Sequence, residues 1–394
     1  NGKKAGIHDY IVGVYFSPDS KNFAYKARDK TKDFNNYFVV FSGQESERYL
    51  TLEDSIYWSA DGKHITYMGV KGYGVKYEGG HSYPAEREYS IIIDNQEIKK
   101  SKENIRSLAN QDKTIIAYLI EEEGILLFPF DNWEVKIEKF GGKINNFVLS
   151  PDGKNFAYTI KIGNKTFLVL NNQKSDKGYD DIDDITFSPN NKSVAYQVNN
   201  YSGNNFVVIN NKEEKGYRFI YDLTFSPDGK HLAYIAEEDD GNRFIVIDEK
   251  EVKRYSSASD LKFSSDSKKL AFIAGYPILE ENDKEAGQFV VIYDLMFNNE
   301  KVGKKYGQIY TEDSSLIFSL DSQHIAYVAT GNWLEDPYFL VVDDKEGNKY
   351  PIIQGDGGDL LPSIGNISFS PDSKNITYQV SIESQLIRGS DDRI

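Results

Sequence analysis

The chain has 394 residues, with 46 basic and 61 acidic side chains and a formal net charge of −15. This negative balance repels phosphate backbones and anionic lipids, so we expect no nucleic-acid partner. No run of eighteen apolar residues occurs, so we also expect no direct membrane insertion. Cysteine is absent, which excludes disulfides, thiolate zinc sites and cysteine nucleophiles. Apolar residues make up 39% of the chain, with 28 Tyr and 23 Phe, as is typical of a β-rich globular protein.

A ten-residue phrase, represented by residues 225–234, returns along the whole chain. Its Ser-Pro-Asp-Gly run at 226–229 predicts a type I turn, because proline presets the backbone angle of the second position. Apolar and aromatic residues alternate on both sides of the turn, as expected of two half-buried strands. Nine copies of the phrase begin at Phe16, Trp58, Leu108, Leu149, Phe187, Phe225, Phe263, Phe318 and Phe369.

The fourth to seventh copies are 38 residues apart, which defines the basic repeat, and the longer intervals carry insertions. Within the sixth repeat the pattern predicts strands at residues 222–225, 231–236 and 244–247 and a fourth strand near Tyr255. Four antiparallel strands that recur at a regular period predict the blades of a β-propeller. The third copy, residues 108–113, is degenerate because it lacks the Ser-Pro turn.

Through this turn, its flanking strands and their spacing, the chain resembles the TolB-type family of WD40-like (Pro-Asp repeat) β-propellers. The resemblance covers nearly the whole chain. It implies an all-β fold, a β-propeller of four-stranded antiparallel blades, as a single domain over residues 1–394. The family usually has fewer blades than there are repeats here. The nine copies favour nine blades, and eight is the alternative if the degenerate third repeat folds differently.

The two ends of the chain complement each other in this pattern. The last repeat, residues 366–394, has the first two strands and a candidate third strand at residues 385–388, but it lacks a fourth. Residues 3–9 precede the first phrase at the place where a fourth strand would lie. We therefore expect the N-terminal strand 3–9 to join the last blade and close the ring, which would remove exposed sheet edges.

Four insertions lengthen the connections between the second and third strands, or between one repeat and the next, at residues 69–88, 275–287, 330–338 and 353–364. In a propeller these connections share one face, here called the upper face, opposite the Ser-Pro-Asp-Gly turns. Loops on a rigid scaffold often bind ligands, and aromatic side chains there either stack on a sugar or peptide or pin down their own loops. The candidate ligand-binding residues are Tyr73, Tyr77, His81, Tyr83, Tyr276, Trp333 and Tyr338.

A second candidate site lies three residues before the repeat aromatic, near the start of the innermost strand. Asp184, Asp222 and Asp260 hold this position in three consecutive repeats. Carboxylate oxygens suit a hard cation, so calcium is the one cofactor that the sequence suggests, with these residues as metal ligands. The alternative is that each carboxylate bonds to neighbouring backbone groups. Acidic loops at 237–240 and 356–359 lack the spacing of an EF-hand.

Familiar catalytic motifs are missing from the sequence. His64, His231 and His324 occupy one position on separate repeats, so we do not expect them to converge on a metal. There is no Gly-x-Ser-x-Gly elbow, zinc-binding helix motif or phosphate-binding glycine loop. We therefore predict a monomeric, non-enzymatic binding or scaffold protein outside the cytoplasm (periplasmic, cell-surface or secreted). It would recognise a protein, peptide or glycan through its upper-face loops. The alternative is a polysaccharide lyase or hydrolase with its site in the central funnel.

Overall fold

The computed structural model describes most of the chain, and every described element of secondary structure is a β-strand. The described residues are 8–30, 36–74, 76–78, 81–110, 114–121, 123–131, 133–278, 290–297, 300–306, 308–309, 316–331, 337–350, 353–355, 358–360, 363–382 and 385–391. Contacts divide the chain into two compact units, Asn1–Gly178 (unit 1) and Tyr179–Ile394 (unit 2). Over these described ranges, no helix long and apolar enough to cross a membrane is found.

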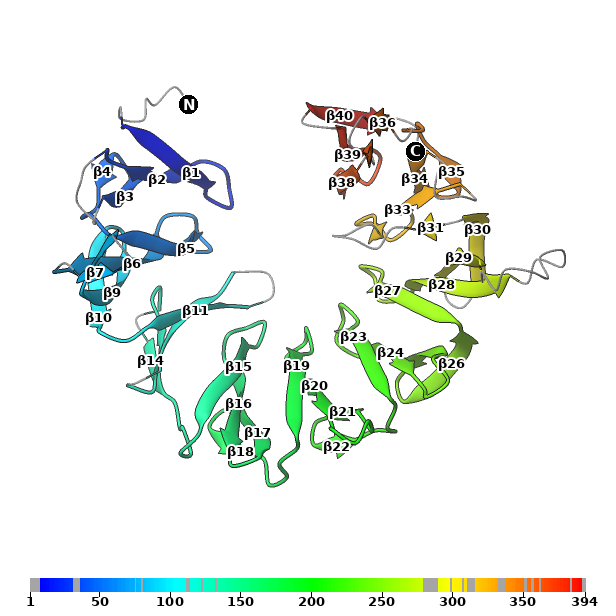
Figure 1. Ribbon diagram of the computed structural model, residues 1–394, viewed down its shortest axis with the longest axis horizontal. Helices are drawn as coiled ribbons and strands as arrows, with labels where there is room; N and C mark the ends of the chain where they lie inside the picture. Colours follow the sequence, from blue (N-terminus) through cyan, green and yellow to red (C-terminus); the bar gives the residue numbers. More distant parts are fainter. Residues whose placement is uncertain are drawn as a thin grey trace. The chain divides into compact units, whose positions relative to one another are not determined.

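Unit 1 contains four sheets, each with four antiparallel strands that pair in sequence order (Figure 1). In the second sheet an extra hairpin of β7 (Lys76–Glu78) and β8 (His81–Tyr83) interrupts the connection between the second and third strands. The sheet strands are β1 (Tyr10–Phe16), β2 (Phe23–Arg28), β3 (Tyr37–Phe41), β4 (Gln44–Glu45), β5 (Thr51–Trp58), β6 (Ile65–Tyr73), β9 (Glu86–Ile93), β10 (Gln96–Ser101), β11 (Ile105–Ala109), β12 (Ile116–Ile120), β13 (Ile125–Phe128), β14 (Trp133–Lys136), β15 (Lys143–Leu149), β16 (Phe156–Ile162), β17 (Lys165–Leu170) and β18 (Gln173–Lys174).

Unit 2 continues the pattern with three four-stranded sheets and a fourth sheet whose first strand is split into two short pieces. The last sheet has three strands among the described residues. The strands are β19 (Asp181–Phe187), β20 (Val194–Asn199), β21 (Phe206–Ile209), β22 (Lys212–Glu213), β23 (Phe219–Phe225), β24 (Leu232–Glu237), β25 (Arg243–Ile247), β26 (Lys250–Tyr255), β27 (Ser257–Phe263), β28 (Leu270–Ile278), β29 (Val290–Phe297), β30 (Glu300–Tyr306), β31 (Gln308–Ile309), β32 (Ile317–Phe318), β33 (Ile325–Thr330), β34 (Tyr338–Val342), β35 (Lys345–Glu346), β36 (Ile353–Gly355), β37 (Gly358–Leu360), β38 (Ser363–Phe369), β39 (Ile376–Ile382) and β40 (Gln385–Asp391).

The predicted fold class is confirmed: the chain is all-β and is built from the four-stranded antiparallel blades of a β-propeller. The degenerate third repeat, which raised the alternative of eight blades, forms the ordinary four-stranded sheet β11 to β14. The number of blades and the single-domain organisation stay predictions.

One repeated pair of side chains on the second strand supplies much of the core. Ala233 and Tyr234 of β24 are 0% and 1% exposed, and they belong to two different core clusters. Neighbouring residues of a strand point to opposite faces, so the alanine fills one side of the sheet and the tyrosine the other. The buried tyrosines at this position are Tyr25, Tyr67, Tyr118, Tyr158, Tyr196, Tyr234, Tyr327 and Tyr378.

The predicted turn is confirmed, and a fixed set of hydrogen bonds holds it. The N–H of Gly229 donates to the Ser226 carbonyl (2.8 Å), and the Ser226 hydroxyl donates to Asp228 Oδ1 (2.7 Å). The same carboxylate oxygen accepts from the N–H of Lys230 (3.1 Å). These bonds, that of Ser226 first, lower the pKa of Asp228 to about 2. The Ser–Asp bond recurs as Ser17–Asp19, Ser59–Asp61, Ser150–Asp152, Ser264–Asp266, Ser319–Asp321 and Ser370–Asp372.

Successive turns are also tied to one another within each unit. Where the next turn has glycine, an asparagine side chain donates to that turn's backbone, as Asn190 Nδ2 does to the Gly229 carbonyl (2.9 Å). Where the next turn has serine, the hydroxyl accepts from a backbone N–H, as Ser267 Oγ does from Asp228 (2.9 Å). Ser267 has a left-handed backbone at this turn position, φ 61°, which is costly for a residue with a Cβ. The same bond joins Asp266 to Ser322 and Asp321 to Ser373.

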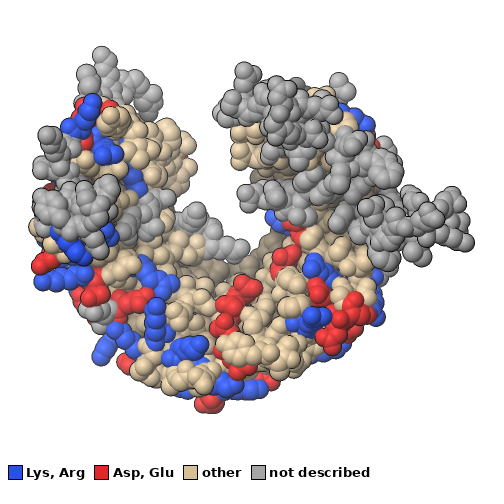
Figure 2. Space-filling view, viewed as in Figure 1, with Lys and Arg blue, Asp and Glu red and all other residues tan. Residues whose placement is uncertain are grey.

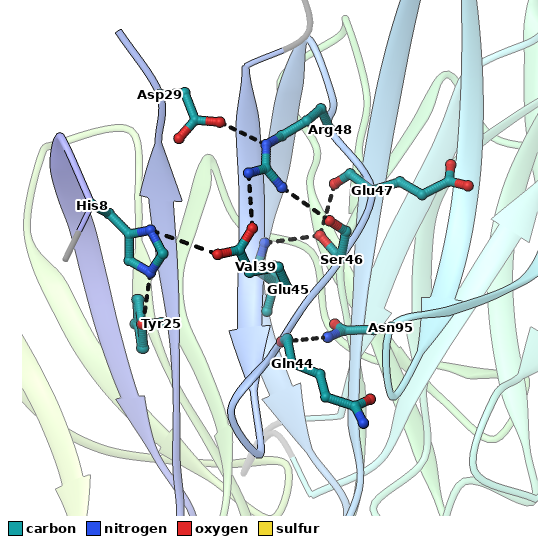
Figure 3. A network of polar contacts seen from close by, with 10 residues as sticks. All are labelled: His8, Tyr25, Asp29, Val39, Gln44, Glu45, Ser46, Glu47, Arg48 and Asn95. Atoms are coloured by element: carbon teal, nitrogen blue, oxygen red, sulfur yellow. Dashed lines mark hydrogen bonds and ion pairs between the residues drawn. The ribbon is translucent and has the colours of Figure 1, made fainter. Parts of the chain in front are cut away.

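The start of the described chain packs on the first sheet (Figure 3). His8 Nε2 lies 3.0 Å from the Tyr25 hydroxyl (Figure 3). The His8 ring also meets Phe38 edge-on, with 5.0 Å between centroids. Arg48 joins Glu45 (2.9 Å) to Asp29 (2.7 Å) beside it. Most of the predicted closing strand, residues 3–7, lies outside the described residues, so ring closure through 3–9 and 366–394 stays a prediction.

Candidate functional site

The predicted insertion at residues 69–88 is a connection only over residues 74–85. Its two ends extend β6 and β9, which pair from Gly69 and Ser90 to Tyr73 and Glu86. Its extra hairpin carries three of the candidate residues, with Tyr77 in β7 and His81 and Tyr83 in β8. Only their backbone lies within the described part of the chain. Tyr73, at the end of β6, is 45% exposed, and its hydroxyl donates to Glu88 Oε1 (3.2 Å). This tyrosine is therefore available at the surface but is oriented by its own loop.

The remaining predicted aromatics differ in their surroundings. The backbone of Tyr276 lies in β28 opposite Ile292, and Trp333 lies outside the described residues. Tyr338 is not the exposed loop residue that we expected. It begins β34, is 5% exposed and packs in a core cluster with Tyr378. Its N–H and carbonyl pair with those of Tyr350, so the chain has already entered the sheet at this position.

The candidate metal ligands Asp184, Asp222 and Asp260 share an unusual backbone. Their φ angles are 49°, 55° and 54°, in the left-handed region, and the strand pairing shifts register beside each of them. Asparagine takes the same place and conformation at Asn146 and Asn366. Asp and Asn adopt this conformation more readily than other side chains, so a β-bulge accounts for the residue type. This conformation is a structural reason for the residue type that differs from the expected bonds to neighbouring backbone groups, and the sequence pattern did not show it.

Burial raises the pKa of two of these three carboxylates. Burial raises the pKa of Asp260 to about 6, with Asp222 adding to the rise and Lys262 opposing it. Burial, then Asp183 and Asp222, raise the pKa of Asp184. Asp260 Oδ2 is buried without a hydrogen-bond partner. Among the described residues no group of three His, Cys, Asp or Glu side chains is placed to hold a metal ion, so calcium binding stays a prediction.

The three repeat histidines each pair with an aspartate of their own sheet. His64 Nδ1 lies 2.6 Å from Asp94, His231 Nδ1 lies 2.7 Å from Asp248, and His324 Nδ1 lies 2.5 Å from Asp343. Each aspartate begins the tight turn between the third and fourth strands, and its other oxygen accepts the N–H that opens the second strand. Each histidine therefore helps to join a turn to a strand of its own sheet. The three lie on separate sheets, as their spacing predicted.

A cleft of about 930 Å³ opens in unit 2 where the fifth and sixth repeats meet, and the sequence reasoning missed it. Residues 202–204, 216–218 and 238–240 line it. They belong to the connections between β20 and β21, between β22 and β23, and between β24 and β25. These are the connections assigned to the upper face. The acidic loop at 237–240 thus contributes to the cleft.

Two exposed aromatic side chains adjoin the lining of the cleft in sequence. Tyr201, next to Ser202, is 80% exposed. Phe219, next to Arg218, is 42% exposed, and the Arg218 guanidinium lies 5.3 Å from the centroid of its ring. The loop at 199–205 belongs to a repeat of the basic length, so no insertion marks it as a candidate site. Its one usable signal is a tyrosine within a run of Asn, Ser and Gly.

Charges of both signs surround the cleft. Arg254 forms an ion pair with Asp240, and Lys215 Nζ lies 3.6 Å from Glu238 Oε1. Arg218 Nη1 donates to the backbone carbonyl of Asp239 (3.2 Å). Figure 2 shows the same intermixing of acidic and basic side chains on the visible face of the described residues. The cleft is thus strongly polar: its lining carries three carboxylates and one guanidinium, and basic side chains outside the lining lie against two of the carboxylates.

No family model and no curated protein matches the chain. Among solved structures, the chain is similar to a eukaryotic initiation factor at 16% identity, over 88% of this chain and 90% of that one, with a TM-score of 0.49. It is similar to the β-propeller domain of the Trilobed protease from Pyrococcus furiosus at 14% identity, over 64% and 83% of the two chains, with a TM-score of 0.37. TolB from Acinetobacter baumannii is similar at 16% identity, over 54% and 57%, with a TM-score of 0.28.

Proposed function

We propose that this chain is a non-enzymatic binding protein, a propeller of the TolB type that works outside the cytoplasm and captures a protein, peptide or glycan with its upper face. The observation that carries the proposal is the 930 Å³ cleft between the fifth and sixth repeats, lined by upper-face connections. Concave sites are the usual form of a ligand site, and the polar lining of this cleft suits a polar ligand.

The scaffold beneath the cleft is well suited to binding. Its loops connect strands whose buried residues, such as Val207 of β21 and Ile235 of β24, are 0% exposed. Such strands hold the loops in place, so little ordering is needed when a ligand arrives. The insertion loops with Tyr83 and Trp333 provide a second group of upper-face residues and stay part of the proposal.

The proposal is tested by affinity capture from extracellular and envelope extracts of the source cells. Wild-type protein is compared with Tyr201→Ala, which removes the exposed ring that precedes the cleft residue Ser202, and with a Tyr83→Ala, Trp333→Ala double variant, which alters the insertion loops. Leu320→Ala is the control, because Leu320 is 64% exposed in a Ser-Asp turn on the other side of the repeat.

We expect a partner that wild type and the control retain and that at least one upper-face variant loses. Equal capture by all four proteins would reject upper-face binding. Cleavage of a captured polysaccharide by the wild type would replace the proposal with the enzymatic alternative, a lyase or hydrolase.

A further inference from the structure

Resting on the proposed function, we propose that the cleft formed by residues 202–204, 216–218 and 238–240 binds a neutral oligosaccharide, with the Tyr201 ring stacked on one sugar. A sugar ring offers an apolar C–H face and a rim of hydroxyl groups. A binding site for it therefore needs an open aromatic face beside closely spaced donors and acceptors. The polar lining of the cleft and the exposed ring of Tyr201, which precedes the lining residue Ser202 in the chain, offer these two features.

Tyr201 provides the aromatic face. Most tyrosines of the repeat pattern are buried in the core, whereas Tyr201 is 80% exposed at the tip of a tight turn. A tyrosine ring supplies a large contact area with few rotatable bonds, so holding it against a ligand costs little conformational entropy. Phe219, 42% exposed, offers a second ring at the start of β23.

The turn that carries Tyr201 is held by its own hydrogen bonds. The N–H of Gly203 donates to the Asn200 carbonyl (2.9 Å), and the N–H of Asn200 donates to Asn205 Oδ1 (2.7 Å). The N–H of Tyr201 itself donates to Asp180 Oδ2 (3.2 Å). The ring is therefore presented from a fixed backbone, which reduces the entropy lost on binding.

The lining supplies both hydrogen-bond donors and hydrogen-bond acceptors. Ser202 carries a hydroxyl, Asn204 an amide, Arg218 a guanidinium and Asp239 a carboxylate, so both roles are represented. Gly216 leaves room for the Asn204 amide, because a Cβ built at this glycine would lie 2.0 Å from Asn204 Oδ1. The glycine thus permits the position of a polar group in the cleft.

The charge balance favours a neutral ligand over a basic peptide or an acidic polymer. The lining carries three carboxylates at 238–240 and one cation, Arg218. Two of the carboxylates are engaged from outside the lining, because Arg254 pairs with Asp240 and Lys215, which also pairs with Glu251, lies near Glu238. A basic peptide would leave these three cations unfavourably placed. An acidic polymer would also be repelled by the net charge of −15.

The test is calorimetric titration of the intact protein with three kinds of probe at low and high salt. The probes are hexasaccharides of glucose, mannose and xylose, an oligogalacturonate, and an oligolysine peptide with tyrosine. We expect at least one neutral hexasaccharide to bind with a Kd that is nearly independent of salt. Tyr201→Ala should weaken this Kd about tenfold or more, and Tyr201→Phe should largely keep it. Gly216→Ala should weaken it by displacing the Asn204 amide, and Leu320→Ala should not change it.

Two results would overturn the glycan assignment. One is binding of a neutral hexasaccharide that Tyr201→Ala and Gly216→Ala leave unchanged. The other is failure of all the neutral probes together with Tyr201-dependent, salt-sensitive binding of the peptide or the acidic sugar. The second result would leave the proposed upper-face binding intact. If no probe binds and the capture experiment also shows no dependence on the upper face, both proposals fail.

Discussion

Asp248 places one carboxylate oxygen 2.7 Å from His231 Nδ1 and the other 3.1 Å from the N–H of Leu232. This one side chain therefore fixes the turn between β25 and β26 to the start of β24. The fourth and fifth repeats, which lack histidine, make the same connection with asparagine. Asn171 accepts from the N–H of Phe156 (3.0 Å) and donates to Asn155 Oδ1 (2.8 Å).

We expect Asp248→Ala to lower the free energy of unfolding by about 1 kcal/mol, and His231→Ala to lower it less. The aspartate serves a backbone donor as well as the ring, whereas the histidine serves only the carboxylate. Urea unfolding followed by circular dichroism measures both. The double variant His231→Asn, Asp248→Asn should return close to wild type because it recreates the pair at Asn155 and Asn171. Equal losses in the two alanine variants would contradict this account.

The left-handed serine of the seventh repeat should tolerate glycine better than alanine. Ser267→Gly and Ser267→Ala both lose the acceptor for the Asp228 N–H, but glycine also relieves the strain at φ 61°. We expect stability to decrease from wild type to glycine to alanine, with about 1 kcal/mol between the two variants. Thermal and urea unfolding give the order. An alanine variant as stable as the glycine variant would show that the backbone strain is unimportant.

Asp260 should make the folded state less stable as pH rises. Burial raises its pKa in the folded state to about 6, above the ordinary value of 3.8, so the folded state binds a proton more tightly than the unfolded state. This contribution stabilises the protein near pH 4 and is lost as pH rises through 6. Asp260→Asn should therefore be more stable than wild type by about 1 kcal/mol at pH 8, less than the full pKa shift implies because Asp260 is partly solvated.

The control for this prediction is the stability of Asp260→Asn relative to wild type at pH 4. At pH 4 the wild-type carboxyl is largely protonated, so wild type and variant should unfold at nearly the same urea concentration. Asparagine suits the left-handed backbone, as Asn146 and Asn366 show at the same repeat position. Parallel stability curves for the two proteins from pH 4 to pH 8 would refute the assignment.

Tyr338 and Tyr201 should respond in opposite ways to the same substitution. Tyr338→Ala removes a side chain that is 5% exposed and should cost about 3 kcal/mol of stability, as large deletions in a core do. Tyr201→Ala removes a side chain that is 80% exposed and should change stability by less than about 0.5 kcal/mol. Urea unfolding distinguishes them. A strongly destabilised Tyr201→Ala would mean that this ring supports the fold.

The repeated phrase predicted the fold class because each copy combines a turn, alternating strands and a regular period. The burial of Tyr234 and the turn at Ser226 follow directly from that pattern. The site was harder to predict. Tyr338 looks like a loop residue in the sequence because nothing marks where the insertion ends and β34 begins, whereas in the structure its pairing with Tyr350 places it inside the sheet.

Two other features depend on backbone geometry that alternation does not reveal. Asp184 reads as a possible metal ligand because its carboxylate is visible in the sequence and its φ of 49° is not. Tyr201 was passed over because its loop has the ordinary length. Its exposure depends on how the turn from Asn200 to Gly203 directs the ring, which is a three-dimensional property.

Because successive turns bond to one another, the structure depends on the order of the repeats as well as on their core residues. A turn that offers the Asn190 side chain suits a successor with glycine, and a turn that offers the Asp228 N–H suits a successor with serine. Repeats with similar core residues therefore differ in the neighbouring turn with which they can form a hydrogen bond. A chain rebuilt with the fifth and seventh repeats exchanged would keep every buried tyrosine but would mismatch its turns.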